Sequence, residues 1–194
     1  MLPPITMRGT EDAGRHGLRC WVPEMTVEIA PVGPADDLAD ILSLIRDYAD
    51  TLQPGPRTVV QREFAGFPMH FAAPEGILLV ARDGEGRPVG CVAFRKSSER
   101  NTCEMKRLFV RAGARGLGIG RALISMAERA AVDAGYSRIE LGTFPDMAAA
   151  QHIYLSADFH PSSRGGSGKM EGLMWFEKDL SPPTTAPVSG ATAE

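Results

Sequence analysis

One glycine-rich segment, Arg115–Arg121, carries the clearest chemical signal in this chain of 194 residues. Glycines alternate with larger residues at positions 116, 118 and 120, and a glycine lets the backbone approach a ligand closely. Apolar residues then recur at helical spacing from Ile119 to Ala134. A glycine turn at a helix N-terminus presents unpaired N–H groups and the positive end of the helix dipole. The segment therefore predicts a phosphate site, and we expect a pyrophosphate as its ligand.

Two common phosphate-binding fingerprints do not fit this segment or any other. The dinucleotide pattern G-x-G-x-x-G/A fails at its sixth position, which is Arg121 or Leu123 here. The Walker A pattern fails because the Gly168-Lys169 pair is followed by methionine rather than by serine or threonine. What remains is the pattern R-x-x-G-x-G over residues 115–120.

This pattern resembles the coenzyme A pyrophosphate loop of the GNAT superfamily, the acyl-CoA-dependent N-acetyltransferases. The resemblance covers roughly residues 26–180 and rests on four segments in the family's order: Cys91–Arg95, Glu104–Val110, the 115–121 loop and Tyr154–Phe159. It implies acetyl-CoA as acyl donor. It also implies that the backbone of the strand end pairs with the pantetheine arm. The cofactor-binding residues would be Leu108, Phe109, Val110, Arg115, Gly116, Leu117, Gly118, Ile119, Gly120 and Arg121.

Tyr154 stands where the family's Y-x-x-x-G-F motif often provides an acid for the leaving thiolate. A phenol with a pKa of about 10 can protonate a thiolate whose conjugate acid has a pKa near 8.5. The chain departs from the motif at Asp158, which replaces glycine, although aspartate tolerates the left-handed conformation better than most residues. It also has 147–151, Met-Ala-Ala-Ala-Gln, where many relatives carry an asparagine that contacts the cofactor. A half-buried core tyrosine is the other interpretation of Tyr154.

Glu104 is the candidate base, because some family members place a strand carboxylate at this point. An amine arrives mostly as an ammonium ion with a pKa near 10.4, so it must lose a proton before it attacks. An exposed ion pair with Lys106 or Arg107 is the competing interpretation. Cys91 and Cys103 lie in apolar runs with no histidine beside them, so we interpret them as buried hydrophobic residues rather than acyl carriers.

The predicted elements follow one another in the order of the GNAT fold. Strands are expected at 26–30, 77–81, 89–95, 103–110, 137–143 and 173–180, and helices at about 38–52, 59–67, 119–134 and 146–157. The fold class is α/β (α+β), with a mixed, mostly antiparallel twisted sheet flanked by helices. One β-α-β crossover, 103–143, carries the CoA loop and should make its two strands parallel. The resemblance implies that these strands diverge and admit the acyl-CoA arm.

Composition sets the remaining expectations. The composition predicts three segments: a loose extension over the aperiodic residues 1–24, the acetyltransferase domain over 25–180, and a disordered tail over 181–194. Met25 is a candidate for the true start of translation. A net charge of −3 argues against a nucleic-acid partner. No apolar run approaches the roughly 18 residues of a membrane span, no signal-peptide pattern opens the chain, and no Cys/His spacing fits a metal. We therefore expect a cytoplasmic protein without a metal.

The resulting hypothesis is an N-acetyltransferase that moves an acetyl group from acetyl-CoA to a primary amine by direct attack in a ternary complex. A non-catalytic acyl-CoA-binding module, acting as a sensor or structural element, is the alternative. Nucleic-acid binding has only Arg8, Arg15 and Arg19 in its favour. The acceptor, a small molecule or a peptide, is not encoded in any motif, and we expect 51–74 and 164–170 to line its pocket. A homodimer is also left open.

Overall fold

The computed structural model describes residues 6–9, 18–22, 25–33, 36, 38–63, 71, 73–163 and 172–180. The domain follows the expected order of strands and helices, with boundaries within a few residues of those predicted for most elements. Its elements from residue 25 onward are β3 (Met25–Pro31), α1 (Leu38–Asp50), α2 (Pro54–Glu63), β4 (Gly76–Arg82), β5 (Pro88–Lys96), β6 (Thr102–Val110), α3 (Ile119–Asp133), β7 (Arg138–Thr143), α4 (Ala148–Ser156), β8 (His160–Ser162) and β9 (Met174–Asp179). The predicted disordered tail, 181–194, lies outside the described residues.

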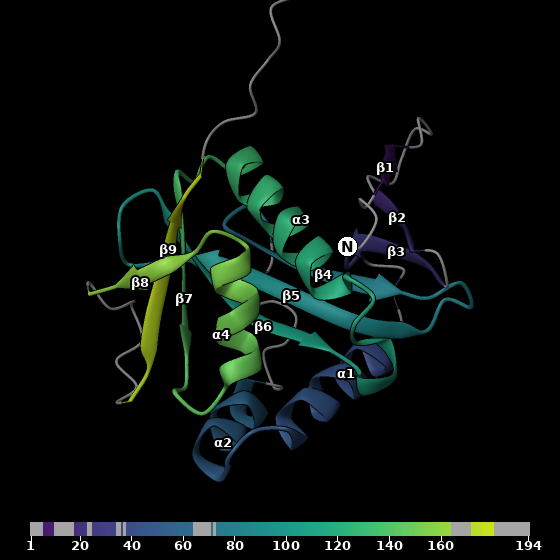
Figure 1. The fold of residues 1–194 in the computed structure, drawn as a ribbon, viewed down its shortest axis with the longest axis horizontal. Helices are drawn as coiled ribbons and strands as arrows, with labels where there is room; N and C mark the ends of the chain where they lie inside the picture. The colour runs from purple at the N-terminus through teal and green to yellow at the C-terminus, as the bar shows by residue number, and fades with distance from the viewer. Residues whose placement is uncertain are drawn as a thin grey trace, which may run out of the picture.

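The strands form a single mixed sheet in the order β1-β2-β3-β4-β5-β6-β7-β9-β8 (Figure 1). Strands β6 and β7 pair in parallel, as the crossover requires, and the other described ladders are antiparallel. The predicted fold class, a mostly antiparallel sheet flanked by helices with one β-α-β crossover, is confirmed.

Two short strands lie within residues 1–24, where the composition predicts a loose extension. They are β1 (Thr6–Gly9) and β2 (Leu18–Val22), and β2 pairs antiparallel with β3 over its whole length. The sequence of residues 1–24 has no periodic pattern. Backbone bonds to the open edge of β3 are enough to define a strand without one.

Strand alternation divides the core between the two faces of the sheet. On one face α3 and α4 pack against side chains that include Val92, Phe94 and Ile139. On the other face α1 and α2 cover side chains that include Leu78 and Val80. Figure 1 shows the two helix pairs on opposite sides of the strands. Because β4 and β5 are buried on both faces, their sequences are nearly continuous apolar runs.

Strands β6 and β7 separate after a short parallel ladder. Pairing covers Thr102–Glu104 with Arg138–Glu140, although β6 continues to Val110 and β7 to Thr143. A bulge bends β6 just beyond the ladder: two of its residues, 107 and 108, face one residue of β5, and Arg107 has a left-handed φ of 60°. A bulge re-aims a strand and ends its pairing. The expected divergence of these two strands is confirmed.

Two helix starts differ from the predicted ones. Helix α2 begins at Pro54 rather than near residue 59, because proline is tolerated in the first turn, where its missing N–H is not needed. Helix α4 does not use Asp146 as its N-cap. Its N-cap is Met147, without a side-chain cap, and the Gln151 amide instead donates to the carbonyls of Phe144 and Pro145, at 3.1 and 3.0 Å.

Candidate active site

The glycine loop has the backbone conformation that a ligand-binding turn needs. Gly116 has φ 79°, and Gly118, the N-cap of α3, has φ 76°, both in the left-handed region where a side chain would be strained. A Cβ at Gly116 would meet nothing within 4 Å, so the backbone there is open. The first N–H groups of α3 have no partner within the helix. The loop therefore presents an array of donors suited to an anion.

The neighbouring side chains of the loop hold it between β6 and α4. Arg115 donates from Nε to the carbonyl of Val110 at 2.9 Å, and the Arg121 guanidinium donates to the carbonyl of Ser156. A Cβ on Gly120 would lie 2.7 Å from Cδ1 of Ile153 on α4. Gly120 thus serves the close packing of α3 against α4, whereas Gly116 and Gly118 serve the turn.

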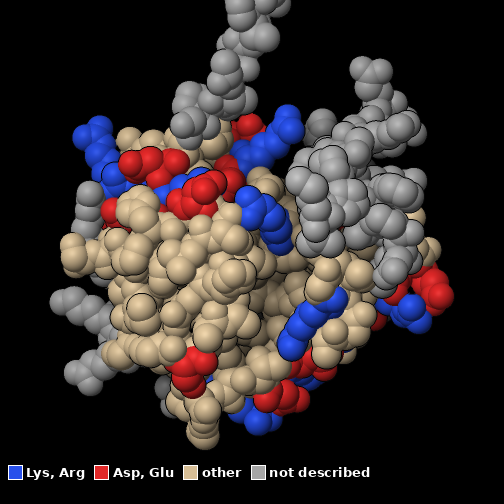
Figure 2. Space-filling view, in the orientation of Figure 1, with Lys and Arg blue, Asp and Glu red and all other residues tan. Residues whose placement is uncertain are grey.

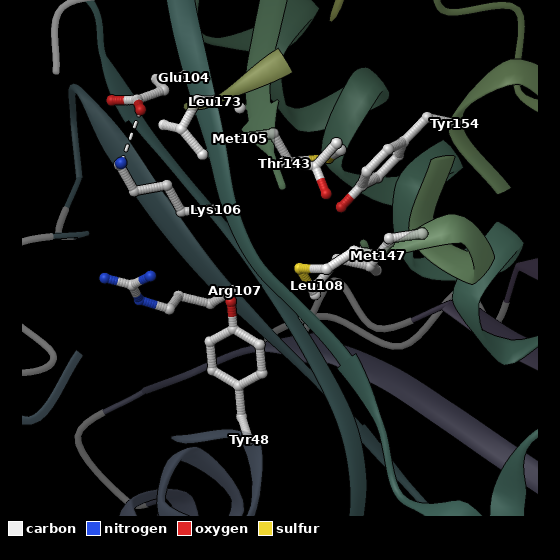
Figure 3. A pocket seen from close by; sticks show the side chains of 12 residues that line it. Tyr48, Glu104, Met105, Lys106, Arg107, Leu108, Thr143, Met147, Tyr154 and Leu173 are labelled. Atoms are coloured by element: carbon white, nitrogen blue, oxygen red, sulfur yellow. Dashed lines mark ion pairs between the residues drawn. The ribbon is translucent and has the colours of Figure 1, made fainter. Parts of the chain in front are cut away.

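A pocket opens where β6 and β7 diverge, and it is built from segments that are distant in the sequence (Figure 3). One wall comes from β6 and the C-terminal part of α1, and the other from β7, α4 and the residue before β9. The lining residues are Tyr48, Glu104, Met105, Lys106, Arg107, Leu108, Gly142, Thr143, Met147, Ala150, Tyr154 and Leu173. Of the sequence-predicted site residues, Tyr154, Glu104 and Leu108 lie here.

Tyr154 is both a core residue and a pocket residue, so the two interpretations of it combine. Its ring lies 6.1 Å from that of Phe159 and 6.3 Å from that of Phe176, and the residue is 8% exposed. Burial raises the pKa of Tyr154 well above its ordinary value, and the nearby Tyr48 phenol raises it further. Tyr154 therefore keeps its proton near neutral pH and is available as a proton donor.

Glu104 forms the expected ion pair, but in a buried rather than an exposed setting. Its carboxylate is 2% exposed and lies 2.6 Å from Nζ of Lys106 and 3.4 Å from the guanidinium of Arg95. Figure 3 shows the Glu104–Lys106 pair beside the pocket. A buried carboxylate requires such partners, because an isolated buried charge is very unfavourable. Glu104 thus lines the pocket with its carboxylate held by two cations.

The two described cysteines are buried thiols, as the sequence indicates. Burial raises the pKa of both Cys91 and Cys103 to about 12. The Cys91 thiol donates to the carbonyl of Arg107, at 3.2 Å, inside the bulge of β6. Because the thiolate is the nucleophilic form, neither residue is suited to carry an acyl group at neutral pH.

Sequence reasoning missed several residues of this pocket. Tyr48, Thr143 and Leu173 line it but belong to no motif quoted from the sequence, and Met147 was named only as the first residue of 147–151. The expected lining segments, 51–74 and 164–170, fall partly outside the described residues, and 51–63 does not line this pocket. Only the divergence of β6 and β7 reveals which side chains meet there.

The comparisons with known proteins agree with this geometry. The family model described as Acetyltransferase (GNAT) family matches residues 38–159, more than half of the chain. The chain belongs to the GNAT acetyltransferase family. It is therefore an acyltransferase, and the non-catalytic binding module is disfavoured.

Relatives at the sequence level carry N-acetyltransferase names. An uncharacterized N-acetyltransferase of Schizosaccharomyces pombe is 34% identical over 158 residues, covering 80% of this chain and 96% of that protein. The human N-acetylaspartate synthetase is 34% identical over 97 residues, which are 50% of this chain and 32% of that protein.

Solved structures share the fold at low identity. A GNAT acetyltransferase of Staphylococcus aureus Mu50 matches with a TM-score of 0.67 at 18% identity, covering 80% of this chain and 99% of that one. The PaiA N-acetyltransferase of Thermoplasma acidophilum, solved with coenzyme A, matches with a TM-score of 0.63 at 16% identity, covering 79% and 98%.

The described surface carries charges of both signs. Figure 2 shows acidic and basic side chains lying next to one another around a largely uncharged area. Within the described residues, no helix combines the length and the apolar character needed to cross a membrane.

Proposed function

We propose that the protein transfers the acetyl group of acetyl-CoA to a primary amine by direct attack in a ternary complex. The opening between β6 and β7 carries this proposal. Its β6 side runs without a parallel partner from Met105 to Val110, and so connects the pocket that holds Tyr154 and Glu104 to the glycine loop before α3. Acetyl-CoA fits this opening, because its anionic pyrophosphate would lie at the glycine loop and its reactive thioester would lie in the pocket.

The cofactor would be held mainly by backbone. The N–H groups at the start of α3, with Arg115 and Arg121 beside them, would bind the pyrophosphate, together with the loop residues Gly116, Leu117, Gly118, Ile119 and Gly120. The pantetheine amides would pair with Leu108–Val110, much as a peptide adds to an exposed strand. Holding both reactants in one site removes much of the entropic barrier. A backbone N–H at the β6 bulge would polarise the thioester carbonyl.

The chemistry then needs one base and one acid. Glu104 would take a proton from the acceptor ammonium, directly or through water, and the free amine would attack the thioester carbon. The new C–N bond forms, the C–S bond breaks, and the Tyr154 hydroxyl gives its proton to the departing sulfur. The attacking nitrogen then loses its second proton to solvent, which leaves a neutral amide. Burial raises the pKa of Tyr154, so the hydroxyl carries its proton until the departing sulfur takes it.

The charges of the pocket favour an acceptor that also carries a carboxylate. Its charged lining residues within the described part of the chain are one carboxylate, Glu104, and two cations, Lys106 and Arg107. Lys106 pairs with Glu104, and Arg107 lies over the ring of Tyr48 at 6.0 Å. The human relative is named for the synthesis of N-acetylaspartate, whose parent amine is an amino acid with two carboxylates. Amino acids therefore come first in an acceptor screen.

Calorimetric titration of acetyl-CoA is the first test. Wild-type protein should bind with micromolar affinity, and Gly118→Arg should abolish binding. Gly135→Arg is the matched control, because Gly135 follows the other end of α3 with a similar φ of 87° and lies away from the proposed site. Binding by the control but not by Gly118→Arg supports the loop as the cofactor site and justifies an acceptor screen by thiol release. A folded wild-type protein that does not bind acetyl-CoA would refute the proposal.

A further inference from the structure

Thr143 carries a buried hydroxyl group that the protein leaves without a partner. The residue is the last of β7 and is 4% exposed, and its Oγ1 has no hydrogen-bond partner among the described residues. Buried polar groups are nearly always satisfied, because an unmade hydrogen bond there is unfavourable. The buried Glu140 on the same strand follows the rule and accepts from the Ser97 hydroxyl at 2.5 Å. Thr143 is the exception that needs an explanation.

The hydroxyl groups of Thr143 and Tyr154 face the same part of the pocket. Thr143 belongs to β7 and Tyr154 to α4, and both line the opening beside Leu108 and Met147. Figure 3 shows the two oxygen atoms pointing toward one another. No hydrogen bond joins them, since Thr143 Oγ1 is unpartnered. A ligand atom placed at this point could accept from both hydroxyl groups at once.

We propose that the Thr143 hydroxyl binds the sulfur atom of the acyl donor, so that Thr143 and Tyr154 form a two-donor site for the leaving thiolate. This inference rests on the proposed function. As the amine nitrogen bonds to the thioester carbon, the C–S bond breaks and its electron pair moves to sulfur. Tyr154 transfers its proton to that sulfur and later regains one from solvent. Thr143 keeps its proton and donates a hydrogen bond throughout.

Two donors suit this pocket better than one. Negative charge develops on sulfur as the C–S bond breaks, and donors already in place stabilise that charge without having to reorganise. Tyr154 gives up its proton reluctantly, because burial raises its pKa. A second hydrogen bond stabilises the sulfur while the C–S bond breaks and before the proton arrives.

Binding of coenzyme A and of desulfo-coenzyme A, which lacks the sulfur, tests this contact without any acceptor. The variants are Thr143→Val, which keeps the shape and loses the hydroxyl, and Thr143→Ser, which keeps the hydroxyl. At pH 9, where a thiol of pKa near 8.5 is largely ionised, Thr143→Val should bind coenzyme A about three- to tenfold more weakly. Its affinity for desulfo-coenzyme A should equal that of wild type, and Thr143→Ser should resemble wild type with both.

The possible outcomes separate this inference from the proposed function. If Thr143→Val loses affinity for neither compound, or equally for both, the hydroxyl does not bind sulfur and the inference is wrong. If wild-type protein binds neither compound, the proposed function itself fails. If wild-type protein binds both through a loop sensitive to Gly118→Arg, the proposed function stands whatever Thr143 does.

Thermal unfolding of the unliganded variants gives a second readout. Valine fills the same space and removes an unsatisfied buried group, so Thr143→Val should be at least as stable as wild type. Lower affinity together with equal or higher stability is the signature of a ligand-binding hydroxyl. A clear fall in stability would instead assign Thr143 a structural role and contradict the inference.

Discussion

The two ends of the opening between β6 and β7 are encoded in different ways. The glycine loop is one continuous run, 115–121, and its candidate function depends on backbone N–H groups and on two left-handed glycines. The pocket at the other end depends on side chains from α1, β6, β7, α4 and the residue before β9. A backbone site can be recognised from adjacent residues, whereas a side-chain site exists only after distant segments meet. Substitutions in the glycine loop should therefore act through the backbone, whereas substitutions in the pocket should act through the lost side chain.

Tyr154→Phe should have the largest effect, and on turnover alone. Removing the proposed acid should lower kcat by about a thousandfold, because a positioned acid contributes on the order of 10² to 10⁴. Affinity for acetyl-CoA, measured by calorimetry, should stay within about threefold, since the loop is untouched. Tyr48→Phe is the matched control, a phenol that lines the same pocket from α1. Equal turnover in Tyr154→Phe and wild type would remove Tyr154 from the mechanism.

Glu104→Gln should reduce turnover by about a hundredfold at pH 7. The loss should shrink as pH rises toward about 10, because the acceptor ammonium then loses its proton without help. Glu140→Gln is the control, since it removes the neighbouring buried carboxylate that faces Glu104 across the β6–β7 ladder but does not line the pocket. A loss that is independent of pH, or equal in both variants, would show that Glu104 is not the base.

Gly116→Ala should act on the loop through the backbone. A left-handed φ of 79° disfavours a side chain, so the free energy of unfolding should fall by about 1–2 kcal/mol. Gly113→Ala is the control in the preceding turn, where a Cβ also meets nothing within 4 Å. It should change stability by less than about 0.5 kcal/mol in chemical denaturation. Similar losses in both variants would mean that the left-handed turn is not what matters.

Gly120→Ala should show the smallest effect, and one that depends on Ile153. The added Cβ would lie 2.7 Å from Ile153 Cδ1, which is the end of a flexible side chain that can shift. Because Ile153→Val removes that atom, Gly120→Ala should be less destabilising in the Ile153→Val protein, with a coupling of about 0.5–1 kcal/mol in a double-mutant cycle. Additive effects would contradict the close approach of α3 and α4.

Part of the fold could be predicted from the sequence alone. The boundaries of β4, β5, β6 and β7 follow from apolar runs and turn residues, because the pattern that buries a strand is local. The left-handed Asp158, with φ 65°, was foreseeable because aspartate tolerates that conformation. The strands of residues 1–24 were not foreseeable, since the edge of β3 defines them.

Some residues of the candidate site could be predicted from local sequence motifs and others could not. Tyr154 and Glu104 were found because each stands in a recognisable motif, and the structure brings both to one pocket. Thr143 could not be found in this way. Alternation along β7 puts Thr143 on the same face as Leu141. The sequence around Thr143 does not indicate that β6 bends away at Arg107 and leaves the Thr143 hydroxyl beside an opening.

The sequence by itself determined the family, the order of the elements and the loop before α3, because glycine spacing and apolar periodicity act over a few residues. The tertiary structure alone decided where β6 and β7 part, which side chains enclose the pocket, and that Glu104 forms its ion pair in a buried place. Those features depend on the bulge of β6 and on contacts between segments as far apart as Tyr48 and Leu173. Such contacts have no local signal, because they are fixed only when the whole sheet and its helices pack together.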